Sequence, residues 1–361
     1  MNSHIAGGFG GSIGVLTGMD QFNFRETYHL QKAEYMTFLG SGTFGQNAIF
    51  TCKSDCTGGT CNKMFVVKRL VYTDKGRAIK KFNQEFNIGV HLHHKNIRKT
   101  FDFDHISNCI LFEYCSGIDL FEYATKSVSN CTRELVTLYD QILQAVCYLH
   151  NLGIAHLDLK LENIIIDTST REIKLIDFGE AVQFKILGKD KELLFSGHRG
   201  TVQYMAPESI DSINFSAPKC DVWSCGIMLY NLLYNKTPWN VANAQRDDRY
   251  KIHKSFARME RLTPFFFKPL QYSDREWKII SYLFRKMLHP LPEKRISIHM
   301  SESIFKLTGL TSTRNPTDDT NLTDETTNTT DEKQDKLKTL KKQKPSWVMK
   351  LYNIYKVLMN G

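Results

Sequence analysis

The sequence predicts an α+β fold in which a small β-rich part is followed by a larger, mainly helical part. Before residue 113, short runs rich in β-branched and aromatic residues dominate, interrupted by one helical pattern at 77–92. After that point, apolar residues recur at three- and four-residue steps, which is the spacing of amphipathic helices. The chain of 361 residues is 42% hydrophobic and 24% charged, as expected of a globular protein with a sizeable core.

The expected elements follow one another along the chain. Five strands are expected in the first part, at 35–39, 48–52, 65–70, 100–103 and 109–112. A helix is expected at 135–149, where one face carries an apolar stripe formed by Leu135, Leu138, Ile142, Val146 and Leu149. Gly153 follows this helix as its expected C-terminal cap, and two more strands are expected at 163–166 and 173–176 around a polar turn.

The two ends of the chain differ in composition from the expected globular region at 34–310. Residues 1–33 are polar and rich in glycine, and we expect a flexible leader there. Residues 311–345 are rich in Thr, Asp and Asn and then in Lys, which indicates a disordered linker. The last residues, 346–361, form a short amphipathic tail that could lie on an anionic membrane, dock on the globular region, or remain solvated.

Charge and cysteine content narrow the function classes. The net charge of +9 is spread thinly and no nucleic-acid-binding pattern accompanies it, so we expect no nucleic-acid partner. No apolar run reaches the length of a membrane span, and the nine cysteines indicate reduced thiols in an intracellular protein. Cys52, Cys56 and Cys61 lie close together, but a zinc site needs four ligands, so an exposed hairpin insertion is favoured over a metal or redox site.

A glycine-rich stretch near the start of the globular region is typical of phosphate binding. Its residues are Leu39, Gly40, Ser41, Gly42, Thr43, Phe44, Gly45, Gln46 and Asn47. Glycine lets the backbone approach phosphate oxygens without a Cβ clash, although the same pattern also occurs in tight hairpins. Lys68 follows in an apolar strand, and Glu85 lies 17 residues further on in the helical pattern. A buried lysine needs a carboxylate partner, so this pair could direct an ammonium group at the α- and β-phosphates of a nucleotide.

The most specific motif is the loop at 156–163, His-Leu-Asp-Leu-Lys-Leu-Glu-Asn. Asp158 can orient an acceptor hydroxyl and accept its proton, and Lys160 can stabilise the γ-phosphate. Asn163 can bind a metal ion, and Asp177 in the Asp-Phe-Gly turn supplies a second metal-binding group. A base, a cation and two metal ligands within about twenty residues predict phosphoryl transfer from ATP with Mg²⁺.

At this point the chain resembles the eukaryotic protein kinase family over roughly 34–310. The resemblance implies a bilobal fold with an N-lobe at 34–113 and a C-lobe at 114–310, and ATP, Mg²⁺ and protein substrates as ligands. It also rests on Ala206-Pro207-Glu208 and on the segment that begins at Asp221. In the family, Arg295 would pair with Glu208, and Asp221 would hold the backbone of the catalytic loop.

The same resemblance assigns the nucleotide contacts and the substrate class. Phe112 would be the gatekeeper, and the adenine would bind the backbone near Glu113 and Cys115. Asp119 would bind the ribose hydroxyls. Lys160 and the run at 200–204 resemble the Ser/Thr branch, in which Thr201 would bridge Asp158 and Lys160. Some fungal nutrient-responsive kinases are faintly similar at Pro238, Trp239 and Asp248.

Three residues depart from the family pattern. Leu157 replaces the arginine that normally pairs with a phosphorylated activation loop, so we expect activity that does not strictly need this phosphorylation. Asn47 and Val66 replace a valine and an alanine that normally surround the adenine. Pocket changes of this size are worth about 1–3 kcal/mol, so we expect weaker ATP binding than the family norm.

Two other functions compete with an active protein kinase. A pseudokinase scaffold would have lost the strand lysine, the catalytic aspartate or the metal-binding aspartate, and none of these is lost. A small-molecule phosphotransferase of similar fold would lack the peptide-positioning segments at 200–208 and 221–226. The substrate itself does not follow from such fold-level analogy.

Overall fold

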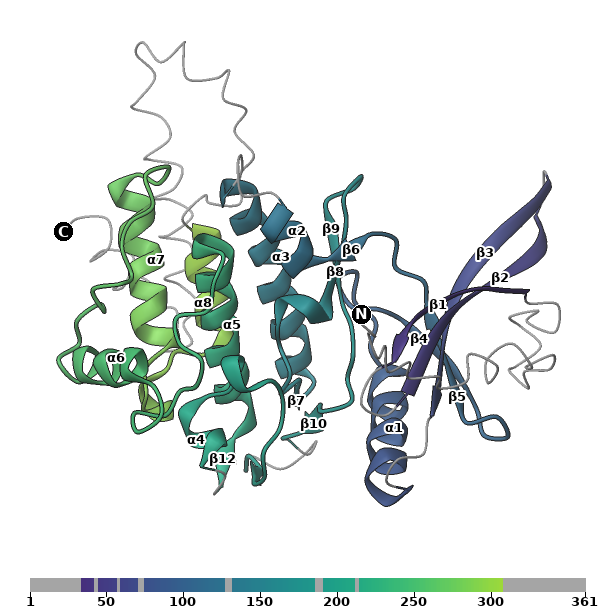
Figure 1. The fold of residues 1–361 in the computed structure, drawn as a ribbon, viewed down its shortest axis with the longest axis horizontal. Coiled ribbons are helices and arrows are strands. Elements are labelled where there is room, and N and C mark those ends of the chain that lie inside the picture. The colour runs from purple at the N-terminus through teal and green to yellow at the C-terminus, as the bar shows by residue number, and fades with distance from the viewer. Residues whose placement is uncertain are drawn as a thin grey trace, which may run out of the picture. The chain divides into compact units, whose positions relative to one another are not determined.

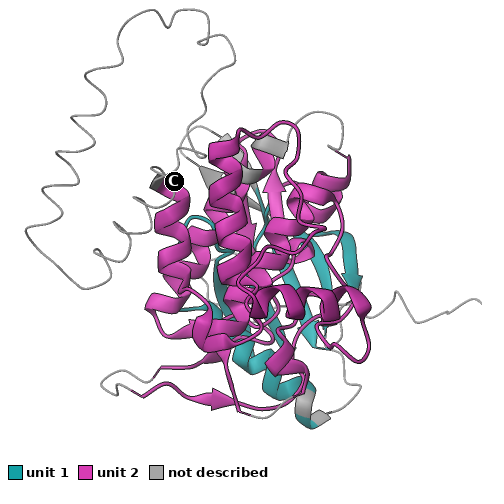
Figure 2. Ribbon diagram, turned by 90° about the vertical axis from the view of Figure 1, so that its left-hand side faces the viewer, with its two compact units in different colours: residues 1–115 teal, residues 116–361 magenta. Residues whose placement is uncertain are grey.

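A five-stranded antiparallel sheet forms the first part of the chain, and helices dominate the remainder (Figure 1). The computed structural model describes residues 34–41, 45–56, 59–70, 75–126, 132–185, 191–211 and 214–307. The chain divides into two compact units, Met1–Cys115 and Ser116–Gly361 (Figure 2). The predicted α+β class is therefore confirmed. The leader at 1–33, the three loop residues Gly42, Thr43 and Phe44, and the C-terminal segments after residue 307 lie outside the described residues.

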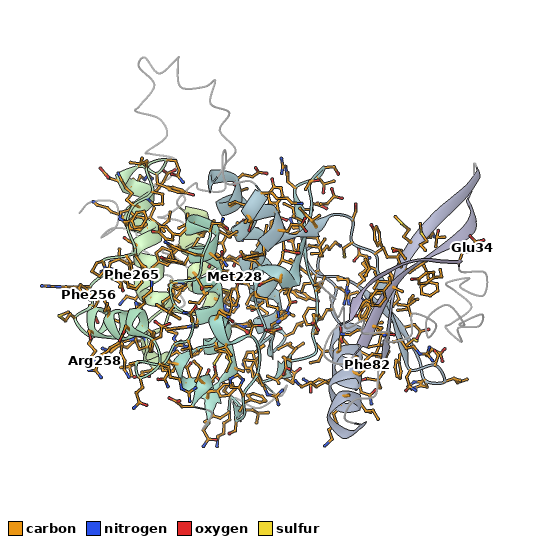
Figure 3. The ribbon with its side chains drawn as sticks, viewed as in Figure 1. Glu34, Phe82, Met228, Phe256, Arg258 and Phe265 are labelled. Atoms are coloured by element: carbon orange, nitrogen blue, oxygen red, sulfur yellow. The ribbon has the colours of Figure 1, made fainter. Side chains whose placement is uncertain are left out.

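In the N-terminal unit, the strands have the spatial order β1-β2-β3-β5-β4. They are β1 (Glu34–Ser41), β2 (Gly45–Cys56), β3 (Gly59–Leu70), β4 (Thr100–Asp104) and β5 (Cys109–Glu113). Helix α1 (Lys75–Gly89) connects β3 to β4 and packs against the sheet. Its buried Phe82, labelled in Figure 3, joins a core cluster with Val66 and Phe112. Because side chains alternate along a strand, Lys68 lies on the same face of β3 as Val66, the face that packs against α1.

The hairpin of β2 and β3 is longer than the two strands predicted at 48–52 and 65–70. Its strands stay in register from Gly45↔Leu70 to Cys56↔Gly59. The three clustered cysteines therefore lie in the outer part of a regular hairpin, and their side chains are outside the described part of the structure.

The C-terminal unit contains most of the helices. Its elements in chain order are β6 (Ile118–Asp119), α2 (Leu120–Lys126), α3 (Thr132–Asn151), β7 (Ile154–Ala155), η4 (Leu161–Asn163), β8 (Ile164–Asp167), β9 (Glu172–Leu175), β10 (Val182–Gln183), β11 (Leu194–Phe195), η5 (Val202–Tyr204), α4 (Pro207–Ile210), β12 (Phe215–Ser216), α5 (Ala217–Tyr234), α6 (Asp248–Arg258), α7 (Asp274–Met287), η6 (Pro292–Lys294) and α8 (Ile298–Leu307). None of the helices in the described ranges combines the length and apolar character that a bilayer span requires.

Helix α5 is the centre of this unit, with α3 and α7 packed against it. Its side chains are buried almost without interruption from Ala217 to Leu233, so it is apolar on all sides rather than amphipathic. Tyr139 of α3 donates its hydroxyl hydrogen to the carbonyl of Cys225, at 3.0 Å. A Cβ on Gly226 would lie 2.7 Å from the side chain of Leu288, so this close packing requires glycine.

Candidate active site

A buried carboxylate of α5 accepts hydrogen bonds from the backbone of the loop between β7 and η4. Asp221 is fully buried and accepts hydrogen bonds from the backbone N–H groups of His156 and Leu157, both at 2.8 Å. The imidazole Nε2 of His150 lies 2.9 Å from the same carboxylate. Leu157 has a φ of 62°, a conformation that side chains rarely adopt, and these bonds hold it there. The conformation of the loop is thus determined by a residue more than sixty positions away in the sequence.

Asp158 follows at the centre of a hydrogen-bond network. Its Oδ1 accepts from the hydroxyl and the backbone N–H of Thr201, at 2.8 and 2.9 Å. Its Oδ2 accepts from the ammonium of Lys160 at 3.0 Å and from the amide of Asn163 at 3.2 Å. These bonds fix both oxygens of a carboxylate that is 14% exposed and still reachable from solvent.

Lys160 and Thr201 are coupled to each other as well as to Asp158. The Lys160 ammonium donates to the Thr201 hydroxyl at 2.8 Å, and that hydroxyl donates to Asp158. The residue before Thr201 is Gly200, with a φ of 87°, and a Cβ there would lie 2.3 Å from the carbonyl oxygen of Leu157. Glycine is therefore required where the segment at 200–201 meets the catalytic loop.

Asn163 and Asp177 are brought together by the small sheet of β6, β8 and β9. The N–H of Ile176 donates to the carbonyl of Asn163 at 2.9 Å, so Asp177 is the residue directly after this link. Asn163 also donates its amide hydrogens to the backbone carbonyl of Asp158, which leaves the amide oxygen as the atom able to bind a cation. Asp177 has a φ of 64° and accepts from the N–H of Gly179. One amide oxygen and one carboxylate form a hard-oxygen donor set that suits Mg²⁺.

In the N-terminal unit, Lys68 and Glu85 form a close ion pair. The Nζ–Oε2 distance is 2.6 Å, and the two side chains are 12% and 2% exposed. Arg98, just before β4, adds a second cation at 3.7 Å from Oε1 of the same carboxylate. The sequence does not predict this role for Arg98, because nothing in the run at 96–100 marks its side chain as buried.

The glycine-rich stretch forms the turn between β1 and β2. Leu39, Gly40 and Ser41 end β1, and Gly45, Gln46 and Asn47 begin β2, with Ser41 paired to Gln46 and Gly40 to Asn47. A Cβ on Gly45 would lie 2.9 Å from the carbonyl oxygen of Arg69 on the neighbouring strand. Asn47 lies directly opposite Lys68 across the β2–β3 ladder.

The predicted adenine and ribose residues lie at the end of the first unit and the start of the second. Phe112 is buried, and the backbone N–H of Glu113 already donates to the carbonyl of Lys99 at 2.9 Å. The Glu113 N–H is therefore already used, and the groups proposed to bind an adenine are the carbonyl of Glu113 and the N–H of Cys115. Asp119 accepts from the N–H of Glu122 at 2.8 Å and so stabilises the first turn of α2.

Two more charged pairs stabilise the segment after Asp177. Arg199 lies 3.6 Å from Glu180, a pair that the sequence did not reveal. Arg295 is completely buried and makes a two-pronged contact with Glu208, at 2.6 and 2.7 Å. This second pair is the one that the resemblance implied.

Comparison with known proteins agrees with this geometry. The model of the protein kinase domain matches residues 33–304. This chain belongs to the protein kinase domain family. Among curated proteins, the kinase domain of this chain is similar to the serine/threonine-protein kinase HAL4/SAT4 of Saccharomyces cerevisiae, with 29% identity over 72% of this chain and 43% of the relative.

Two other fungal relatives were found. Serine/threonine-protein kinase hal4 of Schizosaccharomyces pombe is 28% identical over 72% of this chain and 40% of its own length. The nitrogen permease reactivator protein of S. cerevisiae is 33% identical over 59% of this chain and 27% of its own length. The chain thus spans less than half of the length of these relatives.

Proposed function

We propose that this protein is a serine/threonine protein kinase that transfers the γ-phosphoryl group of Mg-ATP to protein hydroxyls. The observation that carries the proposal is the network in which Asp158, Lys160 and Thr201 contact one another within 3.0 Å. A carboxylate held by fixed donors can orient a hydroxyl, and an adjacent ammonium can stabilise charge that moves onto a phosphoryl group. The Ser/Thr assignment is supported by the relatives named as Ser/Thr kinases and by the threonine within this network.

In the proposed mechanism, Asp158 accepts a hydrogen bond from the substrate hydroxyl and takes its proton as the hydroxyl oxygen bonds to the γ-phosphorus. The bond between that phosphorus and the β,γ-bridging oxygen breaks, and ADP leaves. Lys160 interacts with the oxygens of the transferred phosphoryl group. Asn163 and Asp177 would hold Mg²⁺, which when bound neutralises the negative charge on the phosphates. Lys68, oriented by Glu85, would bind the α- and β-phosphates.

The nucleotide contacts at 39–47, Glu113, Cys115 and Asp119 remain part of the proposal. Weak ATP binding is also part of the proposal. Val66 would occupy space near the adenine beside Phe112, and Asn47 would place a polar group there. A reducing, ATP-rich intracellular compartment would suit this activity and the reduced thiols at Cys109, Cys147, Cys220 and Cys225.

The experiment is a peptide-library phosphorylation assay with the purified chain. We expect Asp158→Asn to lower the rate by about 10²–10⁴-fold, because the substrate hydroxyl loses its base. Glu172→Gln changes an exposed carboxylate on β9 and is the matched control, for which no change is expected. Equal incorporation by the wild type and Asp158→Asn, or incorporation only into tyrosine, would overturn the proposal.

A further inference from the structure

Arg98 is an arginine placed inside the N-terminal unit. It lies between α1 and β4, and its side chain is only 11% exposed. Its guanidinium carbon is 3.8 Å from the centroid of the Phe112 ring. One of its nitrogens is 3.7 Å from Glu85. Arg98 therefore contacts both the proposed gatekeeper and the proposed partner of Lys68.

The two cations use different oxygens of Glu85. Lys68 binds Oε2 at 2.6 Å, and Arg98 approaches Oε1. The carboxylate is 2% exposed, so its position depends on its protein contacts more than on water. At 3.7 Å the Arg98 contact is an ion pair and is longer than a hydrogen bond. A carboxylate that one cation binds closely and a second cation attracts at its other oxygen has less freedom to rotate than one with a single cation nearby.

The distance between α1 and the strand after Arg98 is set by a close contact. A Cβ on Gly89, the last residue of α1, would lie 2.3 Å from Oγ1 of Thr100, the first residue of β4. The Thr100 side chain therefore lies directly against the backbone of the helix end, with no room for a side chain at residue 89. This contact keeps Arg98 within reach of Glu85 one turn earlier in the helix.

We propose that Arg98 is a positioning residue that holds Glu85 through Oε1 while Lys68 binds the phosphates of the nucleotide. The inference rests on the proposed function. The Arg98 contact adds a second attraction on the carboxylate that orients the Lys68 ammonium toward the triphosphate.

The chemistry of arginine suits this position. Its guanidinium stays charged at all relevant pH values and is more weakly hydrated than an ammonium, so it tolerates burial better. The face of Phe112 attracts the guanidinium and takes the place of water on one side. Lys68 and Arg98 contribute two positive charges and Glu85 one negative charge, so the three side chains carry one net positive charge. This charge favours an anionic ligand.

The test compares ligands with and without phosphates. We expect Arg98→Met to raise the KM for ATP and the Kd for ADP by about three- to tenfold, the effect of losing one partly buried charged contact. The Kd for adenosine should stay unchanged, because adenosine makes no phosphate contact. Lys99→Met, at an exposed neighbour, is the matched control and should leave all three values unchanged. Equal weakening of adenosine and ADP would show a merely structural role and overturn the inference.

A second arm tests the route through Glu85. In a Glu85→Gln background, Arg98→Met should change the ADP affinity by less than twofold, because the carboxylate that it positions is gone; a persisting tenfold effect would contradict the inference. Arg98→Lys keeps the charge and is the variant to use if Arg98→Met fails to fold, with an ADP affinity expected between those of Met and wild type. These binding measurements need no phosphoryl transfer, so a wild type that bound ADP but phosphorylated no peptide would refute the proposed function alone.

Discussion

Asp158 owes its proposed role to the donors around it. An isolated carboxylate would rotate freely, whereas four donors from Thr201, Lys160 and Asn163 hold this one. The three residues belong to different local structures: Lys160 to the loop, Asn163 to the 3-10 turn η4, and Thr201 to the segment before η5. The network therefore forms only when all three structures are correctly folded.

Thr201 allows a test at the scale of one hydroxyl. We expect Thr201→Val to lower kcat by about ten- to hundredfold, since the hydrogen bond from the hydroxyl to the Asp158 carboxylate is lost, and a bond to a charged group is worth about 1.5–3 kcal/mol. Thr201→Ser keeps the hydroxyl and should retain most of the activity. The measurement is kcat with a Ser-containing peptide. Equal activity of the Val and Ser variants would show that the hydroxyl has no part in the reaction.

At the scale of elements, the segment at 191–205 is anchored without a phosphate. Leu157, which replaces the usual arginine, is buried. Arg199 instead contacts Glu180, the residue directly after the Asp-Phe-Gly turn. The pair connects this segment to the residue that follows the Asp-Phe-Gly turn, through two charges that need no modification.

This anchoring predicts activity without phosphorylation of the loop. We expect Ser196→Ala to retain wild-type activity, because the exposed Ser196 is not needed for the Arg199–Glu180 contact. Arg199→Glu should lower kcat by about three- to tenfold, and the double variant Arg199→Glu with Glu180→Arg should recover part of it. Loss of activity in Ser196→Ala, or in the wild type after phosphatase treatment, would contradict the prediction.

Helix α6 is attached to the end of α7 through a buried histidine. His253 is 3% exposed; its Nε2–H donates to the carbonyl of Leu288, and its Nδ1 accepts from the hydroxyl of Thr263, both at 2.7 Å. Burial lowers the pKa of His253 from 6.5 to about 4. Both ring nitrogens have hydrogen-bond partners in the neutral form, and a second ring proton would require the Thr263 hydroxyl to change from donor to acceptor.

The direction of this pKa shift predicts acid sensitivity. Between pH 6.5 and about 4, the unfolded chain binds a proton at His253 that the folded chain does not, so stability falls as the pH falls through this window. The contribution at full protonation is about 3 kcal/mol. We expect denaturant unfolding of the wild type to show this loss, and His253→Gln to show a flatter pH dependence from a lower starting stability. His198→Gln, at an exposed histidine, should behave as the wild type does. A direct titration of His253 with a pKa near 6.5 in the folded protein would refute the argument.

At the scale of the whole molecule, two units with separate cores contribute different groups to the proposed reaction. Lys68, the proposed phosphate-binding residue, and its partner Glu85 lie in the first unit, and Asp158, Asn163 and Asp177 lie in the second. Within the second unit, Arg295 connects segments that are far apart in sequence. It donates to Glu208, 87 residues away, and to backbone carbonyls at Lys219 and His289.

Arg295 is therefore expected to stabilise the second unit strongly. Arg295→Leu leaves Glu208 without its partner and should lower the free energy of unfolding by about 3–5 kcal/mol. Lys126→Met, which removes an exposed pair with Glu122, should change it by no more than about 0.5 kcal/mol. Denaturant unfolding monitored by tryptophan fluorescence measures both, because Trp223 lies under the guanidinium of Arg295. Similar changes in the free energy of unfolding for the two variants would show that the buried ion pair stabilises the protein no more than the exposed one does.

The sequence by itself determined the order of the fold and most of the proposed catalytic groups. The groups at 158–163 are local, because Asp158 and Asn163 are only five positions apart in one loop and so lie near each other whatever the rest of the fold. Strand alternation and helix periodicity are also set by residues only a few positions apart, so the sequence predicts a β-rich part at 34–113 and a mainly helical part at 114–310. The Lys68–Glu85 contact was expected because a buried lysine requires a carboxylate.

Tertiary structure alone decided the role of Arg98, the Arg199–Glu180 pair and the burial of His253. Each depends on partners 13 or more residues away, or on neighbouring helices, with no periodicity that links them. A charged side chain carries no local signal of whether it will face water or a ring such as that of Phe112. Its environment is set only when separate elements pack, and that packing also determines the strength of every charge interaction.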